Sequence, residues 1–169
     1  MLLLRRNLLI ASIASGATLY FSPAYAGNTT IKVELWDQGA MSMNMLGKGE
    51  MMDMEHANQA GMPKAPMGIR ISKTQIPAGY VTFNVVNTSK QIVHEMVLSA
   101  ISDTSKSPPY NKTENKIDED AAGHLGEVSE LEPGKKGILK IHIKPGNYLL
   151  YCNVPGHYSL GMWTLLNVK

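Results

Sequence analysis

The chain has 169 residues with one cysteine, and its 16 Lys and Arg residues nearly balance its 14 Asp and Glu residues. A single cysteine cannot form an internal disulfide, which excludes a disulfide-stapled module. A charged fraction of 18% and a formal net charge of +2 provide no reservoir of positive charge for a phosphate backbone, so we expect no nucleic-acid partner. The length favours a single domain.

The first 26 residues have the pattern of an export signal. Arg5 and Arg6 precede an apolar stretch too short for a membrane span, and Ala24-Tyr25-Ala26 supplies the small-x-small pattern of a cleavage site. This predicts a periplasmic protein whose mature chain, residues 27–169, is one domain without a membrane span. The arginine pair also loosely fits a twin-arginine signal, but no Ser or Thr precedes it, so ordinary secretion is the favoured route.

Short strand patterns with Gly and Pro turns between them fill most of the mature chain. Residues 39–67 interrupt the strand patterns as a Met-rich insert, and residues 103–123 read as a second loop with one helical turn at most. About eight short strands without a long helical period predict an all-β fold, either an antiparallel sandwich or a barrel. The clearest strand patterns cover residues 30–36, 68–72, 80–87, 91–99, 135–144, 148–152 and 163–168.

One segment near the C-terminus concentrates residues that bind transition metals. Cys152, His157 and Met162 are spaced C-x4-H-x4-M, and the Gly and Pro residues between them let one loop bring the three side chains together. His94 lies upstream in a predicted strand, on its apolar, inward face. Two imidazoles, a thiolate and a weak axial thioether are the ligand set of a blue-copper site. Copper ligation would also explain an unpaired cysteine in an exported protein.

Other interpretations of the same residues explain less. Taken singly, each could be an ordinary core residue. Cys152 and His157 could form the thiolate–imidazolium pair of a thiol hydrolase, but no orienting acid or oxyanion loop accompanies them and Met162 would have no role. Structural zinc usually takes four Cys or His ligands, and a thioether suits it poorly. We therefore expect one type 1 copper and no enzymatic activity, apart from a minor oxidation of Cu(I).

From Gly68 to the C-terminus the chain resembles a cupredoxin, and its ligand loop is similar to those of rusticyanins, sulfocyanins and auracyanins, where C-x-x-P-G-H and a later G-M also occur. The resemblance implies a Greek-key sandwich of about eight strands. It also implies that His157 lies near the surface, where Pro155, Tyr158 and Leu160 would form an apolar docking patch for electron transfer. The copper ligands implied by the resemblance are His94, Cys152, His157 and Met162.

One position departs from the cupredoxin pattern. Many cupredoxins carry Asn or Ser directly after the first histidine ligand, whereas Glu95 follows His94 in this chain. We expect Glu95 to face Asn153 and to accept the hydrogen bond that ties the two segments together. Its charge would favour Cu(II) over Cu(I).

The insert holds eight of the 11 methionines, and the alternation of Met41, Met43 and Met45 would place three thioethers on one side of an extended chain. Thioethers bind Cu(I) without losing a proton. The segment resembles the Met-rich parts of exported copper-tolerance proteins, although adaptable packing is the alternative. The expected secondary Cu(I) site comprises Met41, Met43, Met45, Met51, Met52, Met54 and His56.

Two functions of different classes fit these features. The first is copper handling for periplasmic copper tolerance, in which the insert captures Cu(I) and the blue site holds or oxidises it. The second is a soluble one-electron carrier for a respiratory or reductase partner. A multicopper oxidase is excluded because the chain has no His-x-His pair. We expect a monomer that binds copper and a redox or copper-transfer protein that the sequence does not name, with His124 on a loop and His142 exposed on a strand.

Overall fold

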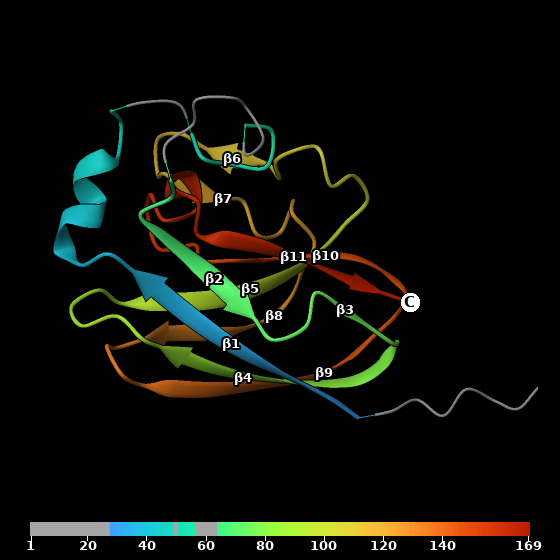
Figure 1. The fold of residues 1–169 in the computed structure, drawn as a ribbon. Helices are drawn as coiled ribbons and strands as arrows, with labels where there is room; N and C mark the ends of the chain where they lie inside the picture. Colours follow the sequence, from blue (N-terminus) through green and yellow to red (C-terminus); the bar gives the residue numbers. More distant parts are fainter. Residues whose placement is uncertain (1–27, 49–50, 57–63) are drawn as a thin grey trace, which may run out of the picture.

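Two β-sheets face each other across an apolar core in the computed structural model, which describes residues 28–48, 51–56 and 64–169 (Figure 1). The predicted export signal, residues 1–26, lies outside the described residues. Eleven strands and two short 3-10 helices occur in the part that is described. In chain order the elements are β1 (Thr29–Asp37), η1 (Ala40–Met45), β2 (Met67–Ile71), β3 (Gln75–Ile76), β4 (Gly79–Asn87), β5 (His94–Ile101), β6 (Tyr110–Asn111), β7 (Lys116–Ile117), β8 (His124–Leu131), β9 (Lys136–Ile143), β10 (Gly146–Tyr151), η2 (Tyr158–Leu160) and β11 (Trp163–Val168).

The strand order confirms the predicted all-β sandwich and corrects the number of strands. One sheet has the order β2-β1-β4-β9, the other has the order β3-β11-β10-β5-β8, and β6 pairs only with β7. The sequence predicts about eight strands because β3, β6 and β7 have two residues each, too few to show a period of two. Strand β8 was missed, with His124 wrongly placed on a loop, because Val128 is its only fully buried side chain.

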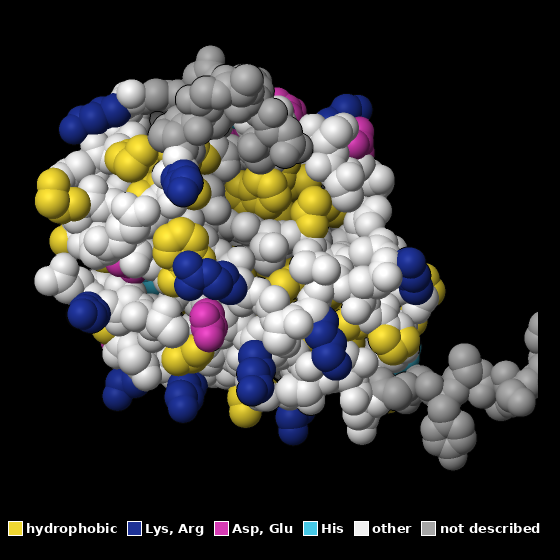
Figure 2. Space-filling view, in the orientation of Figure 1, with side chains coloured by type: hydrophobic (Ala, Val, Ile, Leu, Met, Phe, Trp, Pro, Cys, Tyr) yellow, Lys and Arg dark blue, Asp and Glu magenta, His cyan; other side chains and the backbone are white. Residues whose placement is uncertain are grey.

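Strand β1 shows why the sandwich forms. Ile31, Val33 and Leu35 are fully buried, whereas Lys32 and Glu34 between them face solvent. The burial of this alternating face removes apolar side chains from water and fixes the register of the strand. On the face drawn in Figure 2, most Lys and Arg side chains lie over β1, β4 and β9, the outer surface of the four-stranded sheet. No helix in the described part of the chain is both long and apolar enough to cross a membrane.

The pairing of β10 with β5 joins the two distant parts of the predicted metal site. These strands run antiparallel at the centre of the five-stranded sheet, with Tyr151 opposite Val97. Cys152 directly follows β10, and His94 is the first residue of β5. The sheet therefore brings the thiol to the same end of the sandwich as the upstream imidazole.

Residues 103–123 are more structured than the loop that the sequence predicts, since they include β6 and β7. Together with part of the insert they cover the outer face of the five-stranded sheet and form a second, smaller core. Ile117 and Ala122 are buried there against Val97, Leu149 and other side chains of β5 and β10. This cover explains why β5 is buried on both faces over its first six residues.

The insert begins as a 3-10 helix and not as the extended chain that the methionine alternation predicts. Ser42 directs this change, because its hydroxyl donates to the carbonyl of Pro66 and its backbone N–H donates to the carbonyl of Gly39. A 3-10 helix has three residues per turn, so residues two apart do not share a face. Met41 is accordingly 74% exposed, whereas Met43 and Met45 pack against the main core.

Candidate metal centre

Three of the four predicted ligands come together at one end of the sandwich. The Nδ1 atom of His157 lies 3.2 Å from the Nδ1 of His94 and 3.2 Å from the Sγ of Cys152. All three donor atoms lie within 4.8 Å of one another, and their side chains are almost completely buried. Met162 is also fully buried, in the same core cluster as Cys152. The structure therefore groups the residues that the sequence selected.

The loop that carries Cys152, His157 and Met162 is closed by its own backbone. The N–H of Cys152 donates to the carbonyl of Met162 at 3.0 Å, and the N–H of Met162 donates to the carbonyl of His157 at 3.1 Å. Gly161 ends helix η2 in the left-handed region at φ 89°, a conformation that glycine adopts without strain. These bonds turn the chain so that three ligands spaced five residues apart stay at one end of the sheet.

The turn between β4 and β5 fixes the position of His94. The buried Asn87 side chain donates from Nδ2 to the carbonyls of Ile92 and Leu131, and its Oδ1 accepts the N–H of Ser89. The Ser89 hydroxyl in turn accepts the N–H of Ile92. This network satisfies the buried polar groups and fixes the backbone that enters β5 at His94.

The protonation states of the site argue against a nucleophilic cysteine. Burial raises the pKa of Cys152 to about 12, despite backbone hydrogen bonds from Glu95 and Val154 that act in the opposite direction. Burial also lowers the pKa of His157 to about 4 and lowers that of His94. A reactive thiol needs a lowered pKa and a charged imidazole beside it. In the metal-free protein the Cys152 thiol and the two imidazoles are therefore neutral near pH 7. This favours a ligand site over a hydrolase site.

Glu95 lies where the sequence places it. The N–H of Asn153 donates to Oε1 of Glu95 at 3.0 Å, and the N–H of Glu95 points to Sγ of Cys152 at 3.4 Å. Burial raises the pKa of Glu95 to about 7, and the nearby carboxylates of Glu119 and Glu127 add to this effect. The charge that the sequence assigns to Glu95 therefore depends on pH.

Asp37, at the end of β1, is a site residue that the sequence analysis missed. Its Oδ2 lies 2.8 Å from Nε2 of His94, and the two side chains are 1% and 0% exposed. Burial acts to raise the pKa of Asp37, but hydrogen bonds from Ser89, His94 and the Gly39 backbone outweigh it and lower that pKa. Asp37 continues the inward series of Ile31, Val33 and Leu35, so strand parity alone would have indicated a buried carboxylate.

The insert covers the ligand loop, and this overturns the predicted docking patch. His157 is 2% exposed, Tyr158 is 1% exposed and Leu160 is 3% exposed, so of the four expected surface residues only Pro155 is exposed. The exposed patch was implied by the resemblance to cupredoxins, and nothing in the local sequence indicates what covers these loop residues. Their partners come from distant segments, namely the insert and residues 103–123, where the Tyr110 ring and the Ser107 hydroxyl contact Tyr158.

Backbone contacts hold the insert on the loop. The N–H of Met52 donates to the carbonyl of Ser159 at 2.8 Å, and Nε1 of Trp163 donates to the carbonyl of Met52 at 2.8 Å. The Leu46 side chain also lies directly over Gly156. The first part of the insert and the ligand loop accordingly lie at the same end of the molecule (Figure 1).

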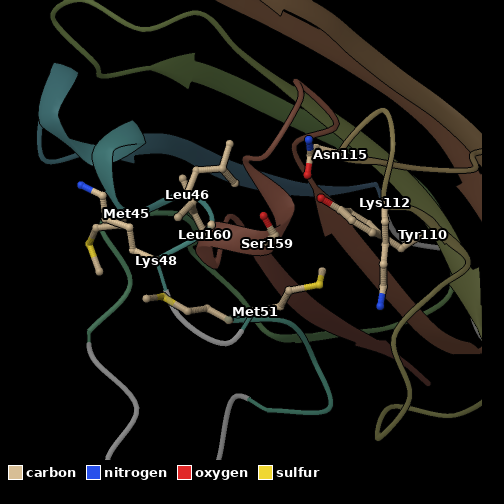
Figure 3. Close-up of a pocket in the computed structure, with 11 residues that line it drawn as sticks. Met45, Leu46, Lys48, Met51, Tyr110, Lys112, Asn115, Ser159 and Leu160 are labelled. Atoms are coloured by element: carbon tan, nitrogen blue, oxygen red, sulfur yellow. The ribbon is translucent and has the colours of Figure 1, made fainter.

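A hollow of about 360 Å³ remains between the insert, the ligand loop and the β6–β7 hairpin. Figure 3 shows Met45 and Met51 on the insert side, Ser159 and Leu160 on the loop side, and Tyr110 on the hairpin side. The expected secondary Cu(I) residues divide between different environments and do not form one group. Met45, Met51 and Met52 line the hollow, Met54 is buried in the second core, Met41 is exposed, and His56 pairs with Asp53 at 2.5 Å.

Comparison with known proteins decides the fold family. Rusticyanin from Thiobacillus ferrooxidans matches with a TM-score of 0.53 and 21% identity over 86% of this chain and 80% of its own. A reduced rusticyanin gives the same TM-score and identity over 86% and 82%. Auracyanin B matches with a TM-score of 0.50 and 20% identity over 89% and 93%. The chain has the cupredoxin fold. Neither a protein-family model nor a curated protein sequence matches it.

The residues at this site fit one type 1 copper ion. Two imidazole nitrogens and a thiol sulfur converge where the buried, closed ligand loop meets the start of β5, and a fully buried methionine belongs to that loop. That is the donor set of a blue-copper centre, in which the thioether is a weak axial ligand. The neutral thiol must lose its proton to ligate, whereas the neutral imidazoles are ready to bind.

The raised pKa values of Cys152 and Glu95 predict how many protons the protein releases when it binds Cu(II). At pH 8 we expect about one proton per ion, from Cys152, because Glu95 is already ionised above its pKa of about 7. At pH 6 Glu95 is mostly protonated in the metal-free protein, and the added positive charge favours its ionised form, so more than one proton should leave. Titration calorimetry in buffers of different ionisation enthalpy measures this number.

Glu95→Gln is the matched variant for the proton count. It keeps the size of the side chain and an oxygen that can accept from Asn153, but it cannot titrate. We expect about one proton at both pH values in this variant. A wild-type count that is the same at pH 6 and pH 8 would contradict a link between Glu95 and the site.

Proposed function

We propose that this cupredoxin is an exported, redox-active copper protein that handles copper in the periplasm, and that its Met-rich insert supplies a second, Cu(I)-selective site. One observation carries the proposal: the insert packs on the ligand loop, in which His157 is only 2% exposed, so the site offers no exposed ligand to an electron-transfer partner. The Sec-type signal of residues 1–26 supports the periplasmic location.

The ligand set explains why the blue site suits a redox role. When bound, copper supplies one-electron chemistry between Cu(I) and Cu(II). The residues themselves hold a fixed, buried geometry, because the loop is tied by backbone hydrogen bonds and both imidazoles are buried. A rigid mixture of sulfur and nitrogen donors accommodates both oxidation states without rearrangement.

The insert brings thioethers next to that site. Met45, Met51 and Met52 face one hollow beside the ligand loop, and among the residues that the structure describes none in the lining of this hollow is acidic or a histidine. Neutral sulfur donors without carboxylates favour Cu(I) over hard divalent ions. A copper-handling protein needs such a selective capture site close to the site that stores the metal.

Methionine-to-leucine variants test the proposal without removing apolar volume. In a Cys152→Ser background, which disables the blue site, we expect the chain to bind Cu(I), and the further change of Met45, Met51 and Met52 to Leu should lower that binding at least tenfold. Competition with a coloured Cu(I) chelator measures the affinity. Met67→Leu and Met96→Leu change buried methionines outside the hollow and serve as matched controls.

The same variants separate copper handling from the alternative role of a soluble electron carrier. If copper handling is the function, cells that carry the leucine variant in the natural background should lose copper tolerance while the blue site stays intact. If Cu(I) binding and tolerance stay unchanged, and the protein exchanges electrons rapidly with a respiratory partner, the carrier role would replace the proposal.

A further inference from the structure

Asp37 occupies a position from which it can control the copper ligand His94. We infer that Asp37 is a positioning residue that directs Nδ1 of His94 toward the metal and makes the site favour Cu(II). This inference rests on the proposed copper site. It assigns a role to a residue of the first strand, distant in sequence from every ligand.

The contact geometry determines which nitrogen of His94 is available. Its Nε2 lies 2.8 Å from Oδ2 of Asp37, whereas its Nδ1 lies 3.2 Å from Nδ1 of His157. An ionised carboxylate only accepts hydrogen bonds, so Nε2 must carry the proton and donate it. The lone pair of Nδ1 is then free and points to the place where the other donor atoms converge.

The carboxylate is itself held in place. Its Oδ1 accepts the backbone N–H of Gly39 at 2.5 Å, and the Ser89 side chain also hydrogen-bonds to it. Asp37 ends β1, where it pairs with Met67 of β2. Because both oxygens have fixed partners, rotation of the carboxylate away from His94 would break several hydrogen bonds inside the protein.

A buried negative charge beside a ligand also changes the balance between oxidation states. The Asp37 side chain is 1% exposed, so water screens its charge weakly. The Asp37 carboxylate therefore attracts a site loaded with Cu(II) more strongly than a site loaded with Cu(I). Hydrogen bonding to the carboxylate also makes the imidazole a stronger donor, which acts in the same direction.

The first test needs no metal. In the copper-free protein, nitrogen-15 NMR of the histidine side chains should show His94 as a single tautomer with its proton on Nε2. Asp37→Leu removes the acceptor and should produce a mixture of tautomers. A wild-type His94 that is protonated on Nδ1, or already mixed, would overturn the inference even if the variant does not fold.

The second test uses the copper-loaded protein. Asp37→Asn keeps the shape and an accepting oxygen but removes the charge, and we expect the Cu(II)-to-Cu(I) affinity ratio to fall about tenfold, which raises the one-electron potential by about 59 mV. Spectroelectrochemical titration measures the potential. Glu34→Gln removes a charge from the exposed face of the same strand and should leave the potential almost unchanged.

The outcomes distinguish the inference from the copper assignment. An unchanged potential in Asp37→Asn, or an equal shift in Glu34→Gln, would overturn the role of Asp37 while the blue site stands. If the wild-type protein shows no thiolate–copper absorption at all, the copper assignment fails. The tautomer measurement then still decides whether Asp37 orients His94.

Discussion

Cys152→Ser is expected to abolish the intense visible absorption of the Cu(II)-loaded protein. In a blue-copper site that absorption depends on a thiolate bound to Cu(II), and Cys152 is the only cysteine in the chain. Serine is close in size and its hydroxyl can accept the N–H of Glu95, as the sulfur does. The loss should therefore reflect ligation and not unfolding. A titration of the mature protein with Cu(II), with copper counted per chain, measures the effect.

Two methionine variants provide the comparison for Cys152→Ser. Met162→Leu removes the predicted axial thioether, so we expect the visible band to remain and the reduction potential to change. Met96→Leu alters another fully buried methionine of the same core and should change neither property. If the band persists without Cys152, or if the two leucine variants behave alike, the ligand assignment is wrong.

Gly161→Ala is expected to destabilise the metal-free protein by about 2–5 kcal/mol. The residue has φ 89°, where a non-glycine residue is strained by about 1–2 kcal/mol. A Cβ at this position would also lie 2.6 Å from Cβ of Ala65, a short side chain with no freedom to move away. Overpacking of this kind costs about 1–3 kcal/mol. Equilibrium unfolding in urea measures the change in the free energy of unfolding.

Gly47→Ala separates the two causes. Gly47 has a similar φ of 72°, but an added Cβ would meet no atom within 4 Å. Gly47→Ala should therefore lower the free energy of unfolding only by the conformational strain, about 1–2 kcal/mol. The excess loss in Gly161→Ala measures the close contact between the insert and the ligand loop. Equal losses in the two variants would show that the insert does not press on the loop.

Much of the metal centre could be predicted because its residues are close in sequence or obey strand parity. Cys152, His157 and Met162 share one loop, so their spacing shows that they can converge. His94 was placed inward by the period of its strand, and its side chain is fully buried. The contact of Glu95 with Asn153 was implied by the resemblance to cupredoxins and is confirmed.

The errors arose where the deciding partner is distant in sequence. Tyr158 and Leu160 were expected at the surface, but the insert and residues 103–123 cover the loop that carries them. Met41, Met43 and Met45 were expected along one side of an extended segment, but the hydrogen bond from Ser42 to Pro66 coils it into a 3-10 helix. Neither contact leaves a pattern in the local sequence.

The sequence by itself determined the all-β class and the donor set of the metal site, because alternating burial and ligand chemistry are properties of short segments. Only the tertiary structure decided how the site is enclosed. The pairing of β5 with β10 brings His94 to Cys152, β1 carries Asp37 to His94, and the insert packs on the loop that carries His157. Burial and hydrogen bonding between distant segments set the pKa values and the charge around the ligands, and these depend on the complete fold.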